Sequence, residues 1–188
     1  MKTNNENLKI ENDLGTFEGF NHRTQEAIYP NVTAQQLMDW DHDELGEAEF
    51  WHSGDNSGVS MILTSNNVSA GDIIALDRLL SELGDHILTL AKLIYRINHH
   101  GYSLHQIEPR DIDDCPASYF IQDVSFIDLR RTAAYELFEL YYPEEFRVWE
   151  KSTCDGLTFD VDSFLDSPGF STAEFQIGEE RILVVEPL

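Results

Sequence analysis

Positively charged residues are scarce in this sequence. Its 188 residues include only 12 Lys and Arg against 35 Asp and Glu, which gives a formal net charge of −23. No Lys or Arg occurs between Arg23 and Arg78 or between Lys151 and Arg181, although acidic residues continue through both gaps. A surface of this sign repels nucleic acid and anionic membranes and attracts basic surfaces. We therefore expect no direct nucleic-acid or membrane binding, and a partner protein with a basic surface.

Cysteine and long apolar runs are also scarce. Cys115 and Cys154 form neither a CxxC pair nor a zinc-ligand spacing. The most apolar stretch, residues 73–97, is interrupted by charged residues, so we do not expect it to cross a bilayer. The N-terminal residues are polar and lack the apolar core of a signal peptide. Together these absences predict a cytoplasmic protein.

The sequence contains none of the short motifs that mark common enzyme chemistry. It has no P-loop, no GxGxxG and no GxSxG, and neither cysteine lies in a catalytic motif. Pairs of carboxylates do not distinguish an enzyme from a non-enzymatic protein in a chain this acidic. We expect a non-enzymatic protein without a cofactor, although one enzyme-like resemblance, described below, keeps the question open.

Apolar residues are present in the amount that a folded core requires. Hydrophobic residues make up 41% of the chain, so the acidity is not a mark of disorder. Residues 1–13 are polar and Asn-rich, and we expect a flexible N-terminal arm there. No repeat or linker divides the rest, so residues 14–188 are predicted to form a single α+β domain.

The strongest periodic signal predicts one long central helix over about residues 72–99. Apolar residues alternate at spacings of three and four: Ile73, Leu76, Leu80, Leu83, Ile87, Leu90, Ile94 and Ile97. Ser69 with Asp72 forms an N-terminal capping pattern, and Gly101 forms a stop. Further apolar residues widen the stripe, which favours a helix buried in one domain. A dimer through this helix remains an alternative, so the oligomeric state is left open.

Short strands, hairpins and shorter helices are expected around that helix. Turn-rich residues 53–58 predict a hairpin between 50–52 and 59–64. The pair Gly178-Glu179 predicts a second hairpin between 174–177 and 181–185.

The densest acidic run, residues 39–44, resembles the start of a calcium loop but fails as one. Glu44 stands where the loop needs Gly, and Phe50 stands where it needs a bidentate Glu. We therefore expect no metal in this run.

We predict instead that two acidic surfaces bind a partner. Trp40 and Trp51 would anchor the first surface, because aromatic residues dominate binding energy at interfaces. The candidate residues are Asp39, Asp41, Asp43, Glu44, Glu47, Glu49, Trp40 and Trp51 in the first segment, and Asp155, Asp160, Asp162 and Asp166 in the second.

Three histidines gather near the end of the predicted long helix. Imidazoles are common zinc ligands, which makes His99, His100 and His105 a candidate metal site. Adjacent residues on a helix point in different directions, however, and positive character at a helix C-terminus is favourable in itself. We expect helix termination there and no metal.

The segments INHHGY at 97–102, LHQIEPRDI at 104–112 and FIDL at 126–129 occur in an order that resembles the C-terminal lobe of protein kinases. The resemblance implies a helix, a catalytic loop and a strand that ends at a metal-binding Asp. Matched from Pro109, Gln106 stands at the catalytic Asp and Asp111 at the metal-binding Asn, and only Asp128 keeps its type. No Lys occurs from residue 10 to 91 to pair with phosphates. The resemblance thus implies a degenerate relic.

The sequence favours an acidic, non-enzymatic protein that occupies a basic, nucleic-acid-binding surface of a partner. DNA mimics and nuclease inhibitors, such as anti-restriction, anti-CRISPR and immunity proteins, share this logic. The alternatives are an acidic cytosolic adaptor domain and a degenerate kinase-like enzyme using residues 99–128.

Overall fold

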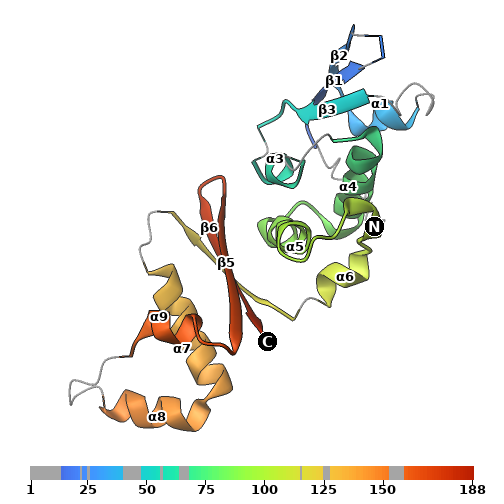
Figure 1. Ribbon diagram of the computed structural model, residues 1–188. Coiled ribbons are helices and arrows are strands. Elements are labelled where there is room, and N and C mark those ends of the chain that lie inside the picture. The colour runs from blue at the N-terminus through green and yellow to red at the C-terminus, as the bar shows by residue number, and fades with distance from the viewer. Residues whose placement is uncertain are drawn as a thin grey trace, which may run out of the picture.

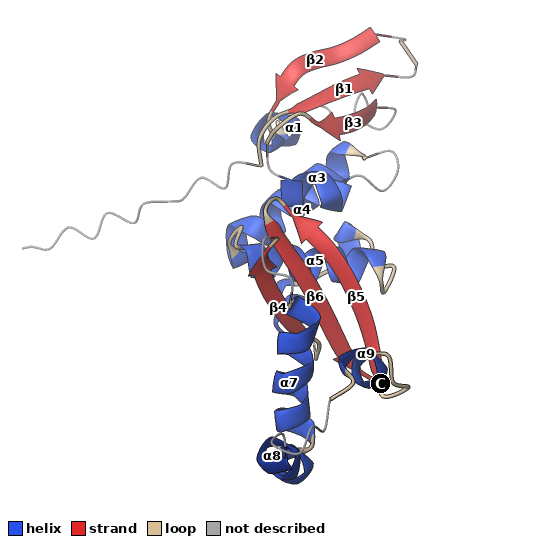
Figure 2. Cartoon of the chain, turned by 90° about the vertical axis from the view of Figure 1, so that its left-hand side faces the viewer, coloured by secondary structure: helices blue, strands red, loops and turns tan. Residues whose placement is uncertain are grey.

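The described part of the chain contains two three-stranded antiparallel sheets, each packed against helices (Figure 1). The computed structural model describes residues 14–21, 23–24, 26–39, 48–55, 57–63, 68–114, 116–124, 128–152 and 159–188. The architecture mixes helices and strands, as the sequence predicts. The first sheet lies at one end of the molecule, and α3 and α4 separate it from the second sheet (Figures 1 and 2).

The first sheet consists of β1 (Phe17–Asn21), β2 (Glu26–Val32) and β3 (Ala48–His52), in the order β2-β1-β3. Phe17 and Phe50 are buried on its inner face, which faces the core. The short helix α1 (Ala34–Met38) follows β2 and begins with a capping box between Thr33 and Gln36. Alternation along β1 and β3 therefore gives this sheet one buried and one outward face.

The region after β3 corrects one prediction. The expected hairpin between 50–52 and 59–64 is wrong, because residues 57–63 form the helix α3 (Ser57–Leu63). Val59, Ile62 and Leu63 are buried, and their spacing of three and four matches one helix face. A short apolar run is compatible with the spacing of a strand or of a helix. Here the run forms a helix because that conformation packs its apolar side chains against the core.

The predicted long central helix is also wrong, since the structure holds two helices of moderate length. α4 (Ala70–Leu83) and α5 (Ile87–Asn98) are separated at Gly84, whose φ of 82° no right-handed helix allows. The capping box of Ser69 and Asp72 is confirmed at the start of α4. Both helices bury their apolar stripes in one cluster, which explains why the spacing looks continuous. The alternative of a dimer through one long helix assumed a continuous helix over residues 72–99, and the structure has α4 and α5 instead.

The second sheet has helices on both faces. It contains β4 (Ser118–Asp123), β5 (Phe170–Ile177) and β6 (Glu180–Pro187), in the order β4-β6-β5. Ile182 and Val184 of the central strand join the core of α4 and α5, whereas Leu183 and Val185 join a second core. Figure 2 shows α7 (Leu129–Tyr141) in front of this sheet and α5 behind it. The predicted C-terminal hairpin is confirmed, with Gly178 at a φ of 59°.

The remaining helices complete the second half of the chain. η1 (Leu104–Gln106) and α6 (Pro109–Asp113) connect α5 to β4. α8 (Pro143–Ser152) lies against α7, where Phe146 and Trp149 contact the ring of Phe138. α9 (Val161–Leu165) precedes β5 and buries Leu165. Among the described residues, no helix is both long and apolar enough to cross a membrane.

Candidate partner-binding surface

The outward face of the first sheet presents an exposed tryptophan between carboxylates. Glu18 of β1 lies directly opposite Trp51 of β3, and Phe20 lies opposite Glu49. The indole Nε1 of Trp51 donates a hydrogen bond to Oε2 of Glu18 at 2.9 Å, and 48% of Trp51 remains exposed. We call these four residues (Glu18, Phe20, Glu49 and Trp51) the outer sheet face.

A half-buried histidine, His52, fixes β3 in place beneath that face. His52 contacts the hydroxyl of Ser60 through Nδ1 and the carbonyl of Leu14 through Nε2, both at 2.7 Å. A Cβ atom at Gly54 would lie 2.7 Å from Nε2 of His52, so only glycine leaves room for the ring. These contacts tie β3 to α3 and to the residues before β1, which holds the outer sheet face rigid.

The structure brings part of the first predicted acidic segment to the outer sheet face. Glu49 and Trp51 belong to the face, and Asp39 is exposed at the C-terminal end of α1. The other predicted residues, Trp40, Asp41, Asp43, Glu44 and Glu47, lie outside the described residues. Glu18 and Phe20 were not among the predicted residues. Their alternation with the buried Phe17 and Gly19 is the signal that would have found them.

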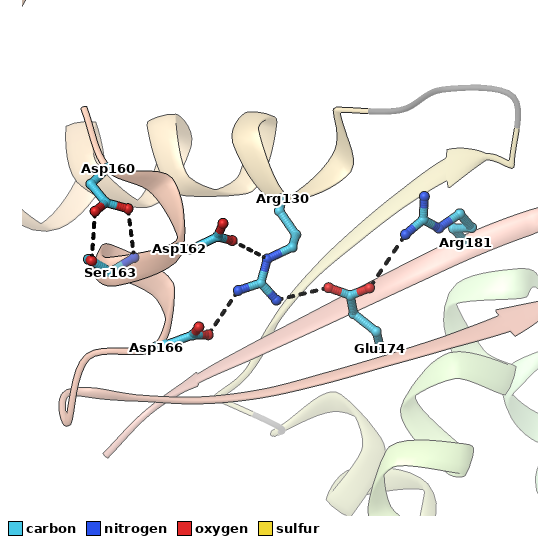
Figure 3. Close-up of polar contacts among 7 residues, drawn as sticks. All are labelled: Arg130, Asp160, Asp162, Ser163, Asp166, Glu174 and Arg181. Atoms are coloured by element: carbon cyan, nitrogen blue, oxygen red, sulfur yellow. Dashed lines mark hydrogen bonds and ion pairs between the residues drawn. The ribbon is translucent and has the colours of Figure 1, made fainter. Parts of the chain in front are cut away.

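The second predicted segment is held by an arginine that the sequence analysis did not consider (Figure 3). Arg130 of α7 contacts Asp162 at 3.0 Å, Asp166 at 2.8 Å and Glu174 at 3.0 Å. Arg181 contacts the other oxygen of Glu174 at 3.5 Å. We call these five residues the Arg130 cluster.

The Arg130 cluster reduces the negative charge of this surface. Partial burial of Arg130 would lower its pKa, but the hydrogen bonds to Glu174, Asp166 and Asp162 outweigh burial and raise the pKa above its usual range. The guanidinium therefore stays charged. Asp162 and Asp166 are occupied within the molecule, so this surface is less open to a basic partner than the sequence alone suggests.

The other two predicted residues of the second segment are Asp160 and Asp155. Asp160 is exposed and accepts hydrogen bonds from the backbone N–H and the hydroxyl of Ser163, at 3.0 and 2.8 Å. The backbone hydrogen bond, followed by the hydroxyl, lowers the pKa of the Asp160 carboxyl. Asp160 thus serves as the N-cap of α9. Asp155 lies outside the described residues.

The three histidines have separate polar partners. His99 contacts the hydroxyl of Ser171 at 3.0 Å, and His100 contacts Glu186 at 3.2 Å. His105 contacts Asp72 at 3.1 Å, at the start of α4. Within the described part of the chain, no group of three or more His, Cys, Asp or Glu is placed to hold a metal ion.

Two of the residues singled out by the kinase-like resemblance cap short helices. The side chain of Gln106 accepts the backbone N–H of Ser103 at 3.1 Å. The carboxylate of Asp111 accepts the N–H of Glu108 at 2.8 Å. Asp128 occupies the N-cap position of α7 without a side-chain capping bond. The contacts of Gln106 and Asp111 are those of capping residues.

Comparison with known proteins found no match to this chain. No family model, no curated protein and no solved structure matches the chain.

Proposed function

We propose that this chain is an acidic, non-enzymatic, cytoplasmic binding protein that occupies a basic, nucleic-acid-binding surface of a partner protein. The class is that of DNA mimics and nuclease inhibitors, which includes anti-restriction, anti-CRISPR and immunity proteins. The outer sheet face carries the proposal, since Trp51 stands exposed on a rigid sheet beside Glu18 and Glu49.

Trp51 has the properties of an interface anchor. Tryptophan is enriched among the few residues that carry most binding energy. The hydrogen bond to Glu18 holds the indole in one orientation before binding. Less side-chain freedom is then lost when a partner docks, which favours affinity.

The charge of the molecule favours a partner that normally binds nucleic acid. A DNA duplex carries one negative charge per about 1.7 Å of axis, and its protein readers present Lys and Arg in grooves. A folded chain of net charge −23 is attracted to such grooves over long range. Electrostatic attraction of this kind speeds association and makes it sensitive to salt.

The experiment that tests this function is a pull-down from native cytosol at low and high salt. We expect a nucleic-acid-binding protein to be retained at low salt, to elute at high salt, and to be displaced by added duplex DNA. Trp51→Ala should lose most of this retention, whereas Leu140→Ala, which removes another exposed apolar side chain, should not.

Two outcomes would overturn the proposal. Retention that Trp51→Ala leaves unchanged would remove the role of the outer sheet face. A partner that duplex DNA does not displace would instead support the acidic adaptor. No contact described above favours the kinase-like alternative, because Gln106 and Asp111 are engaged in helix caps.

A further inference from the structure

We propose that the edge strand β5 binds an extended, basic segment of a partner protein as an added β-strand, with one apolar side chain of that segment entering a hollow between β5 and α5. This site belongs to the second sheet. It does not depend on the outer sheet face of the first sheet.

β5 is a sheet edge with unused pairing capacity. Among the described strands, the order β4-β6-β5 leaves β5 with β6 as its one strand neighbour (Figure 2). In an antiparallel ladder, alternate residues direct their N–H and C=O groups away from the neighbouring strand. Counted from the turn, where Ile177 pairs with Glu180, the outward residues are Thr172, Glu174 and Gln176. Within the described ranges, no backbone hydrogen bond joins residues 171–176 to a segment other than β6. Such an edge is a template for another strand.

A hollow of about 180 Å³ lies beside this edge. Ile94 of α5 and Ala173 and Phe175 of β5 supply apolar walls, and Asn98 and His99 supply polar groups. Alternate side chains of an added strand point to the same side, so one of them can enter the hollow while the backbone pairs with β5.

The wall formed by α5 is fixed before any partner binds. Tyr95 is buried and donates a hydrogen bond from its hydroxyl to Glu186 at 2.8 Å. Its ring stacks on His99, with centroids 4.8 Å apart. His99, which lines the hollow, in turn contacts Ser171 of β5 at 3.0 Å and so links α5 to β5. A preorganised site of this kind costs little ordering on binding.

The negative charge of the molecule favours a basic segment as the strand that pairs with β5. Pairing of two β5 edges would bring together two chains that each carry a net charge of −23. A second copy is therefore disfavoured, and an extended segment rich in Lys or Arg is attracted. The carboxylate of Glu174 is engaged by Arg130 and Arg181, so the attraction comes from the field of the whole molecule.

The test begins with a displayed library of random decapeptides, selected on the full chain at low salt. We expect the selected peptides to carry an apolar residue flanked by Lys or Arg. Their synthetic versions should bind at least tenfold more weakly to Asn98→Trp, which fills the hollow, and to Thr172→Pro, which removes an outward N–H at an edge position. Glu82→Trp, an exposed position on α4, should bind as the unmodified chain does.

Hydrogen exchange locates the bound peptide. The amides of Thr172, Glu174 and Gln176 should become protected when peptide is added. Failure to select any peptide, or equal binding by Asn98→Trp and Glu82→Trp, would overturn the inference. Protection of those amides in a dimer without peptide would show that a second copy occupies the edge. Trp51→Ala should leave peptide binding unchanged, which separates failure here from failure of the proposed function.

Discussion

At the scale of single residues, Arg130 connects three elements that are distant in the sequence. Its guanidinium contacts Asp162 and Asp166 near α9 and Glu174 on β5. About a third of Arg130 is exposed, at 30%, so each pair contributes modestly, since exposed ion pairs are worth roughly 0.2–1 kcal/mol. Removal of Arg130 would also take the counter-charge from Asp162 and Asp166, and would leave Glu174 with its longer contact to Arg181.

We predict that Arg130→Ala lowers the free energy of unfolding by about 1–2 kcal/mol, as the sum of these pairs. Arg130→Lys should recover only part of the loss, because an ammonium cannot contact three carboxylates in the fork geometry of a guanidinium. Denaturant unfolding measures the difference. Arg147→Ala, which breaks one exposed pair with Glu144, is the matched control and should change little. Equal effects of Arg130→Ala and Arg147→Ala would contradict this account.

Asp160 gives the molecule a pH-dependent helix cap. The hydrogen bonds from Ser163 lower its pKa in the folded state. Its contribution to stability is therefore present above the pKa of the unfolded chain and is lost as pH falls through the folded pKa. We predict that Asp160→Ala destabilises the protein at neutral pH, and that the difference from the unmodified chain disappears in acid. Denaturant unfolding at several pH values measures this, and a difference that persists in acid would be inconsistent with the cap.

At the scale of elements, Gly84 decides between one helix and two. Its φ of 82° is strained for a residue with a side chain, and a Cβ there would lie 3.2 Å from Cδ2 of His86. In a continuous helix, by contrast, Gly is about 1 kcal/mol worse than Ala. The two arrangements therefore predict opposite signs for the same substitution.

We predict that Gly84→Ala lowers the free energy of unfolding by at least about 1 kcal/mol. Ser81→Ala, one turn earlier on an exposed position of α4, serves as the control and should have a small effect. Thermal or denaturant unfolding measures both. An increase in stability with Gly84→Ala would show that the helix is continuous.

The elements that were predicted correctly are those set by local sequence patterns. The Gly178-Glu179 turn and the capping box of Ser69 and Asp72 are each set by residues close in sequence, and both are confirmed. The break at Gly84 could not be predicted from apolar spacing, because α4 and α5 bury their stripes in the same core. Helix α3 was missed because packing, and not local turn chemistry, selects its conformation.

The candidate site was less predictable because it depends on pairing over long sequence distances. Trp51 was identified as an anchor from its type alone. Its partner Glu18 lies 33 residues away and is placed by the register of β1 and β3. Arg130 lies 32 residues from Asp162, and their contact follows from the packing of α7 against α9. Neither contact leaves a local signal.

At the scale of the whole molecule, the two sheets differ in how they are packed. The second sheet has helices on both faces, and its central strand β6 buries Ile182 and Val184 in one core and Leu183 and Val185 in the other. The first sheet lies at one end and presents an outward face to its surroundings (Figure 2). The chain as a whole carries a net charge of −23. The molecule thus combines a sheet packed between helices with a terminal sheet that has one outward face.

The most direct measurement is the affinity of the captured partner for the purified chain across a series of salt concentrations, with Trp51→Ala, Glu18→Gln and Leu140→Ala measured in parallel. We predict that affinity falls steeply with salt, that duplex DNA competes, and that Trp51→Ala weakens binding at least tenfold, about 1.4 kcal/mol. Glu18→Gln, which keeps an acceptor for the indole, should chiefly reduce the salt dependence. If affinity changes neither with salt concentration nor with Trp51→Ala, this result would contradict the proposal that the outer sheet face docks on a basic, nucleic-acid-binding surface.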